Sequence, residues 1–135
     1  MTMPAEHSVQ TVAHGFTDLC AQGKLSEAQR YWSDDVVSIE AFPGEYQVCR
    51  GREAVLAKQR AWNESVVMHA MRCEGPFIHG DQFSVIFQQE CSDLEGNPQN
   101  LREVALYTVR GGQVVEERFF PMMPADQTPP AQPAI

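Results

Sequence analysis

The chain has 135 residues and a formal net charge of −8. A chain of this length forms one domain, large enough to bury a core without disulfides or metals. Its 10 lysines and arginines are scattered along the sequence, so we do not expect a nucleic-acid partner, which needs a concentrated positive surface. No apolar run approaches the ~18 residues that cross a membrane, so a membrane partner is not expected either.

The cysteines indicate a reducing compartment. Cys20, Cys49, Cys73 and Cys91 have no CxxC spacing and fall within predicted helices or strands. The chain also starts without the apolar run of a secretory signal. We therefore predict free thiols and a soluble, cytoplasmic protein. Because the histidines are dispersed and no phosphate-binding glycine motif occurs, we expect neither a metal nor a cofactor.

Three segments in the first half of the chain carry helical patterns. Residues 8–21 place apolar side chains three and four positions apart, with Ser8 as N-cap and Gly23 as the stop, which predicts an amphipathic helix. Residues 26–32 predict a second, shorter helix, and residues 51–65 are rich in helix formers and predict a third.

The first strand is predicted between the second and third helices, at residues 36–41. Because side chains alternate along a strand, Glu40 is expected on the opposite face from Ile39 and Ala41, away from any pocket. A β-bulge would reverse this placement. A loop follows, with a short extended piece at residues 46–49.

The second half of the chain predicts four long strands. Residues 66–77 and 82–91 form two of them, and residues 101–121 form a hairpin around Gly111 and Gly112. Since the helices precede most of the strands, the predicted fold class is α+β with a mostly antiparallel sheet.

Two registers are compatible with the hairpin. A two-residue turn would place Ala105 opposite Arg118, whereas a three-residue loop, with Gly112 at positive φ, would place Ala105 opposite Glu117. We favour the loop, because it gathers a mixed polar and aromatic face. Its members are Glu103, Ala105, Tyr107, Val115, Glu117 and Phe119. Two carboxylates suit a pocket wall better than a plain core.

Several motifs together resemble the SnoaL-like, or nuclear transport factor 2-like, superfamily. They are YWSDDVVSIEA, RGREAV, FIHGDQFSV and VALYTVRGGQVVEERFF. The resemblance implies a SnoaL-like domain over residues 8–121, after a polar lead of residues 1–7 and before a proline-rich tail of residues 122–135. It also implies a cone-shaped fold, in which three helices pack on a curved sheet and close an apolar pocket. A homodimer formed through the outer sheet face and a small hydrophobic ligand are further implications.

The resemblance also bears on known activities. The catalytic positions of ketosteroid isomerases fall at Phe16, near Ala41 and at Ala105, and all three lack the required groups. Isomerisation by that mechanism needs a base and an enolate donor and is therefore not expected. Dehydratase-like relatives use a histidine on the strand after the third helix, where this chain has His69, together with an acid for which Asp18 is the candidate on the first helix.

We predict His69, Glu103 and Glu117 as candidate catalytic residues. An imidazole titrates near neutral pH, and an apolar wall raises the pKa of a carboxyl group. The alternatives are a histidine satisfied by a backbone carbonyl, and one carboxylate that points to solvent while the other pairs with Arg102, Arg118 or a dimer partner. The candidate ligand-binding residues are Phe16, Trp32, Trp62, Phe87, Ala105, Tyr107 and Phe119.

Three functions are open from the sequence. The first is a cofactor-independent lyase, isomerase or cyclase that uses general acid-base chemistry in an apolar pocket. The second is a binding protein that keeps the pocket without chemistry, and the third is a protein-interaction module that uses the outer sheet face. An enzyme needs at least two polar groups that converge on one bound molecule, whereas an interaction module leaves an exposed apolar sheet face.

Overall fold

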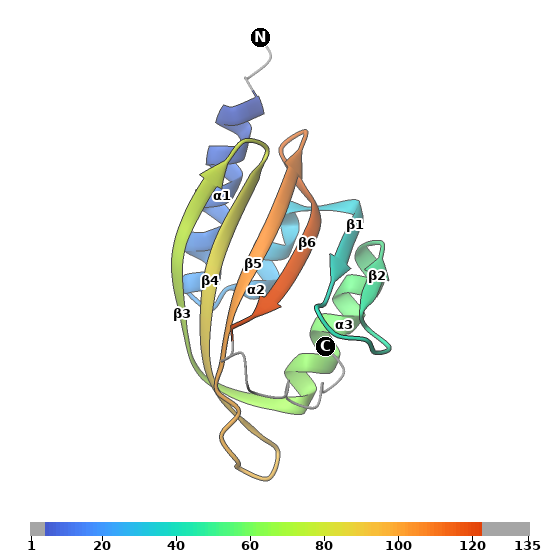
Figure 1. Ribbon diagram of the computed structural model, residues 1–135, viewed down its shortest axis with the longest axis vertical. Helices are drawn as coiled ribbons and strands as arrows, with labels where there is room; N and C mark the ends of the chain where they lie inside the picture. The colour runs from blue at the N-terminus through green and yellow to red at the C-terminus, as the bar shows by residue number, and fades with distance from the viewer. Residues whose placement is uncertain (1–4, 123–135) are drawn as a thin grey trace.

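A computed structural model describes residues 5–122, which form a six-stranded sheet with helices on one face (Figure 1). The helical elements are α1 (Ala5–Ala21), α2 (Leu25–Ala28), the 3-10 turn η1 (Gln29–Tyr31) and α3 (Arg52–Ser65). The strands are β1 (Trp32–Ile39), β2 (Val48–Arg50), β3 (Val66–His79), β4 (Gln82–Asp93), β5 (Leu101–Arg110) and β6 (Gln113–Pro121). Within the described residues, no helix is long and apolar enough to span a membrane. Of the predicted tail at residues 122–135, all but Met122 lies outside the described part.

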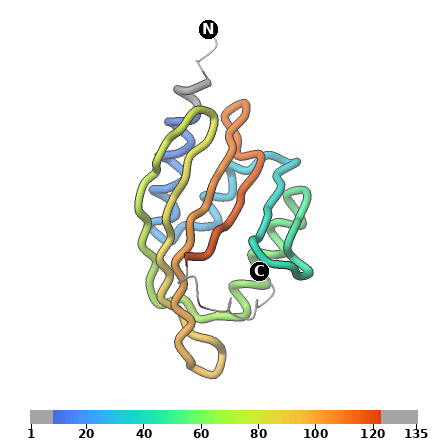
Figure 2. Tube along the Cα trace, in the orientation of Figure 1, coloured from blue at the N-terminus to red at the C-terminus, as the bar shows by residue number. Residues whose placement is uncertain are grey.

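The sheet order is β2-β1-β6-β5-β4-β3. Only β1 and β6 pair in parallel, and the other neighbours are antiparallel. Helix α1 packs over β3, β4 and β5, while α3 packs on β1, β2 and β3, so that the helices cover opposite ends of the same face. The path of the chain in Figure 2 shows the long strands bending together. The predicted α+β fold is confirmed.

Helix α1 ends at a left-handed glycine. Gly23 has φ of +75°, and Lys24 N–H donates to the Leu19 carbonyl at 2.8 Å while Gly23 N–H donates to the Cys20 carbonyl at 3.0 Å. These two bonds satisfy the last carbonyls of the helix, as in a Schellman motif. The predicted start was wrong, since the helix begins at Ala5 and Ser8 lies inside it. Alanine and glutamate before Ser8 are good helix formers and extend the helix past the capping signal.

The predicted second helix is shorter than expected. Helical geometry ends at Tyr31, and Trp32 is extended, with φ of −72° and ψ of 138°. Trp32 therefore begins β1 instead of ending a helix. Its indole lies where the helical layer meets the sheet, and it is only 5% exposed.

Irregularities in β3 bend the sheet. The pairing of β3 with β4 shifts register between Met68 and Ala70 and again between Glu74 and Phe77. Such bulges bend a strand and increase its twist. The bent sheet wraps around a core that includes Phe16, Phe83 and Tyr107, whose rings stack or meet edge-on.

The hairpin has the two-residue register at its turn, where Arg110 pairs with Gln113, and neither predicted register beyond it. Gly111 and Gly112 form a two-residue turn with φ of +58° and +77°, so the predicted three-residue loop was wrong. The register then shifts in β6 between the pairs of Thr108 and Val109, which leaves Val115 without a partner. Ala105 consequently lies opposite Phe119, and Tyr107 lies opposite Glu117.

The bulge preserves most of the predicted face despite the different register. The observed pairing is displaced by two residues from the favoured one, and a displacement of two keeps each side chain on the same side of the sheet. Glu103, Tyr107, Glu117 and Phe119 thus share the helix-covered face as predicted, and Ala105 is buried there. Val115 sits at the bulge and does not belong to that face.

Candidate functional site

A cavity of about 100 Å³ lies between the sheet and the helices. Every helix, η1 and all strands except β2 contribute to its wall. Six of the seven predicted ligand-binding residues line it: Phe16, Trp32, Trp62, Phe87, Tyr107 and Phe119. Ala105 is completely buried beside them and does not reach the cavity. Whether these side chains bind a ligand stays a prediction.

Glu117 is the last acceptor of a buried hydrogen-bond chain. Its side chain is only 4% exposed, and Ser38 Oγ donates to Glu117 Oε2 at 2.7 Å. Lys58 Nζ in turn donates to Ser38 Oγ at 2.6 Å. The bond between Ser38 and Glu117 forms because β1 and β6 are adjacent parallel strands, in which Ser38 pairs directly with Glu117. Lys58 reaches the same point from α3.

The second partner of Lys58 is Glu40. The two side chains form an ion pair, and each is only 7% exposed. Lys58 Nζ also lies 4.9 Å from the centre of the Phe119 ring, where the ring face attracts a cation. The predicted placement of Glu40 was therefore wrong, because it lines the cavity together with Glu117. Val36, Ser38 and Glu40 form the buried face of this strand segment.

The pKa values of the two predicted carboxyl groups are raised. Burial raises the pKa of Glu117 from 4.5 to about 7, while the hydrogen bond from Ser38 and the charge of Lys58 oppose the shift. Burial also raises the pKa of Glu103 to about 8, helped by the negative charge of Glu40. Near neutral pH, Glu103 is thus mostly protonated, and Glu117 exchanges readily between its two forms.

Two buried polar atoms of the cavity wall have no hydrogen-bond partner among the described residues: Trp32 Nε1 and Gln89 Oε1. Trp32 is close enough to Glu117 to help lower the pKa of that carboxyl, yet the geometry falls short of a hydrogen bond. Gln89 is only 8% exposed. Unpaired buried polar groups are costly, and a bound molecule that pairs with them removes the cost.

His69 lies apart from the predicted carboxylates. Its side chain is exposed, it does not line the cavity, and its Nε2 forms a hydrogen bond with Ser92 Oγ at 2.8 Å. The register shift between Met68 and Ala70 directs Met68 into the cavity wall instead. Asp18 is also exposed on α1 and has no place in the cavity wall. The structure brings Glu103 and Glu117 to one cavity and does not bring His69 there.

The predicted site residues did not include Glu40, Lys58 and Gln89 of the cavity wall, nor Ser38, which donates to Glu117 and accepts from Lys58. Strand alternation groups Ser38 and Glu40 with apolar Val36, and this grouping was the available signal. Nothing in the local sequence distinguishes Lys58 from the exposed Arg60 of the same helix. Among the described residues, no group of His, Cys, Asp and Glu could hold a metal ion.

The chain is similar to known proteins in both sequence and structure. The SnoaL-like domain family matches residues 7–121. A solved structure from Mesorhizobium loti, a candidate SnoaL-like polyketide cyclase with carbohydrate phosphatase as a second label, is 36% identical. The match covers 83% of this chain and 97% of that chain, with a TM-score of 0.79. No curated protein sequence matches the chain at a significant level.

More distant structures share the fold. A candidate SnoaL-like polyketide cyclase from Jannaschia sp. CCS1 is 20% identical over 90% of each chain, with a TM-score of 0.68. A candidate isomerase from Bacillus subtilis is 13% identical over 89% of this chain and 90% of that chain, with a TM-score of 0.64. The family match spans most of the sequence, and these structures share the fold of this chain. The chain therefore belongs to the SnoaL-like domain family, within the nuclear transport factor 2-like fold.

Proposed function

We propose that the protein is a cofactor-independent lyase, isomerase or cyclase that moves protons on a small apolar carbonyl compound. The observation that carries the proposal is the buried chain from Lys58 through Ser38 to Glu117, which ends in the cavity. A carboxyl group held in this way has a fixed orientation and can accept a proton from a bound molecule. The aromatic and aliphatic lining suits a flat apolar body.

Glu117 acts as the base in this proposal. In its ionised form it removes a proton from the carbon next to the carbonyl group, and negative charge develops on the carbonyl oxygen. Trp32 Nε1 lies close to Glu117 at the same end of the cavity, and it donates a hydrogen bond to that oxygen when the substrate is bound. A preorganised donor at the position of developing charge stabilises the transition state. The Lys58 charge helps to keep Glu117 ionised.

Glu103 supplies the second proton. It lies on β5, four residues from Tyr107, the cross-strand partner of Glu117, so roughly 13 Å of strand separates the two positions. Protonated Glu103 can return a proton to a distant carbon, which completes an isomerisation, or to a departing hydroxyl group, which completes a dehydration. In a cyclisation, the enolate carbon attacks a second carbonyl group and Glu103 protonates the new alkoxide. His69 has no role, because it lies outside the cavity.

The names of similar structures support this reaction class over a phosphatase. The Mesorhizobium loti and Jannaschia proteins are candidate polyketide cyclases, and the Bacillus subtilis protein is a candidate isomerase. The second label of the Mesorhizobium loti protein, carbohydrate phosphatase, fits this chain poorly. Among the described residues of the cavity wall, the one cation is Lys58, and it already pairs with Glu40, so little positive charge is left to bind a phosphate ester.

Proton exchange tests the proposal without knowledge of the product. A naphthalene with an acetyl group is incubated in D₂O, and NMR follows the loss of its methyl protons. The wild-type protein should accelerate the exchange, and Glu117→Gln should slow it by at least about 100-fold. The matched control is Glu116→Gln on the outer face, which should exchange at the wild-type rate. Equal rates for the two variants, or no acceleration by the wild type, would refute the proposal.

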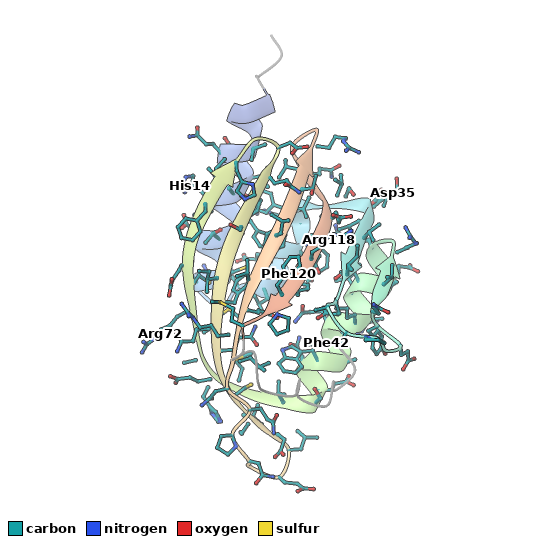
Figure 3. All side chains as sticks on the ribbon, viewed as in Figure 1. His14, Asp35, Phe42, Arg72, Arg118 and Phe120 are labelled. Atoms are coloured by element: carbon teal, nitrogen blue, oxygen red, sulfur yellow. The ribbon has the colours of Figure 1, made fainter. Side chains whose placement is uncertain are left out.

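The outer face of the sheet favours a homodimer as the assembly. Phe120 is 46% exposed, and its neighbours across the strands are Val104 and then Ile86, both partly exposed. Figure 3 shows Phe120 and Arg118 on the face turned away from the helices. An exposed apolar row on a sheet suits a second copy of the chain. Light scattering should give twice the chain mass for the wild type and a monomer for Phe120→Glu.

The cytosol is the proposed location, since all four cysteines are free in the structure.

A non-catalytic binding protein is the second candidate function, and the unpaired Trp32 and Gln89 atoms favour it equally. The two candidates differ in one outcome. A binding protein would retain acetylnaphthalene without accelerating the exchange of its methyl protons.

A further inference from the structure

Gln89 is a buried polar residue that the proposed chemistry does not use. Its side chain is only 8% exposed, it lines the cavity, and Oε1 has no hydrogen-bond partner in the described part of the chain. Leaving a buried amide unpaired costs about 1–3 kcal/mol. An apolar residue of similar size would fill this position without that cost, so the amide needs an explanation.

The sheet register places Gln89 at the opposite end of the cavity from Glu117. Gln89 pairs with Leu101 at the start of β5, whereas Glu117 pairs with Tyr107 near its other end. Six residues of strand separate Leu101 from Tyr107, which corresponds to roughly 20 Å. The distance between groups bound at the two ends is smaller, because both side chains reach into the cavity.

The wall between the two ends is mostly apolar. Phe87 and Met71 contribute from β4 and β3, and Phe119 contributes from β6. Glu103 is the one carboxyl group close to Gln89, since it pairs with Phe87, two residues along β4. A ligand that spans the cavity therefore meets polar groups at its ends and apolar side chains along its body.

We propose that Gln89 determines specificity by binding a hydroxyl group at the far end of the substrate, so that the cavity selects apolar carbonyl compounds with a distal hydroxyl. The inference rests on the proposed function for the position of the carbonyl group, at the Glu117 end. A hydroxyl group suits this amide in either orientation, because it donates to Oε1 and accepts from Nε2.

Binding of two matched probes tests the inference. The first probe is a naphthalene with an acetyl group at one end and a hydroxyl at the other, and the second is the same acetylnaphthalene without the hydroxyl. Calorimetry measures the dissociation constant of each with the wild-type protein. The hydroxyl should tighten binding by about fivefold to tenfold, as expected for a hydrogen bond to an otherwise unpaired buried group.

The variants separate this hydrogen bond from general effects. Gln89→Leu and Gln89→Met should bind both probes equally, whereas Gln88→Leu, an exposed neighbour on β4, should keep the preference. Two variants at Gln89 guard against a folding defect in one, and thermal unfolding checks each of them. Equal binding of the probes to the wild type, no binding of either probe, or a preference that survives both Gln89 substitutions would overturn the inference.

The result is independent of turnover. If the hydroxyl preference holds but the methyl protons do not exchange, the proposed chemistry fails and the recognition by Gln89 stands. If exchange is fast and the hydroxyl makes no difference to binding, the chemistry stands and the role of Gln89 fails.

Discussion

The two faces of β6 place identical residue types in opposite environments. Glu116 and Glu117 are adjacent, and so are Phe119 and Phe120. Glu117 is buried and bonded to Ser38, whereas Glu116 lies on the outer face and pairs with Arg118 at 3.2 Å. Phe119 packs in the cavity wall beside Lys58, while Phe120 is 46% exposed.

The difference between the faces shows that strand alternation decides the environment of each side chain, and with it the reactivity of the carboxyl groups. On the outer face, water solvates each charge, so an ion pair there adds little to stability. On the inner face, the same carboxyl group loses its hydration, which disfavours the ionised form and raises the pKa. A nearby cation opposes this rise. The inner carboxyl groups therefore gain a reactivity near neutral pH that surface carboxyl groups lack.

The largest expected effect comes from removing the inner cation. Lys58→Met leaves Glu40 without its partner in the cavity, and the free energy of unfolding should fall by about 3–5 kcal/mol. Urea denaturation measures the change, and Arg60→Met on the exposed side of α3 should change it little. Adding Glu40→Gln to Lys58→Met should restore part of the loss. A double variant no more stable than the single one would contradict a penalty from the unpaired charge.

The next largest effect is expected in the pH dependence of stability, to which the inner carboxyl groups contribute and the outer ones do not. The pKa values of Glu103 and Glu117 are about 8 and about 7 in the folded state, above the ordinary 4.5. Between pH 4.5 and the folded-state pKa of each group, the folded state holds a proton that the unfolded chain has released. The contribution is thus fully present below pH ~4.5 and declines as pH rises through the folded pKa values, by at most ~1.4 kcal/mol per pH unit per group.

Denaturation between pH 5 and 8 measures this slope. The double variant Glu103→Gln and Glu117→Gln should be flatter than the wild type, because glutamine does not titrate. Glu116→Gln on the outer face should keep the wild-type slope. If the free energy of unfolding of the double variant declined with pH as steeply as that of the wild type, Glu103 and Glu117 would not be the source of the pH dependence.

A smaller effect is expected from the link between Lys58 and Glu117. Ser38→Ala removes a hydrogen bond that lowers the pKa of Glu117, so this pKa should rise further above 7. The free energy of unfolding should fall by about 1–3 kcal/mol, because two buried groups lose their shared partner. Carbon-13 NMR of the carboxyl group follows the titration, and Ser84→Ala, outside the cavity wall, serves as the control. An unchanged or lowered pKa would rule out the role of Ser38.

The smallest effect is expected at the outer ion pair. Arg118 is 45% exposed and Glu116 is 33% exposed, so Arg118→Gln should lower the free energy of unfolding by no more than about 0.5 kcal/mol. Thermal or urea unfolding is sufficient to measure it. A loss as large as that of Lys58→Met would remove the distinction between the two faces.

Local patterns predicted much of this fold. The helices over α1 and α3, the four long strands and the glycine turn of the hairpin all follow from periodicity and turn residues, which act over a few positions. The inward face with Glu103 and Glu117 was also predicted, although the register was wrong. The bulge at Val115 was not predictable, because it depends on how β6 pairs with β1 and β5 together.

The sequence by itself determined the α+β class, the alternation of β5 and β6 and the two carboxyl groups on one face. Only the tertiary structure decided that Glu40 joins them, that Lys58 reaches them from α3 and that His69 stays outside. The physical reason is the sequence distance over which each feature is determined. Alternation is a property of neighbouring residues, whereas the cavity brings together Ser38, Lys58 and Glu117 from three elements far apart in the chain.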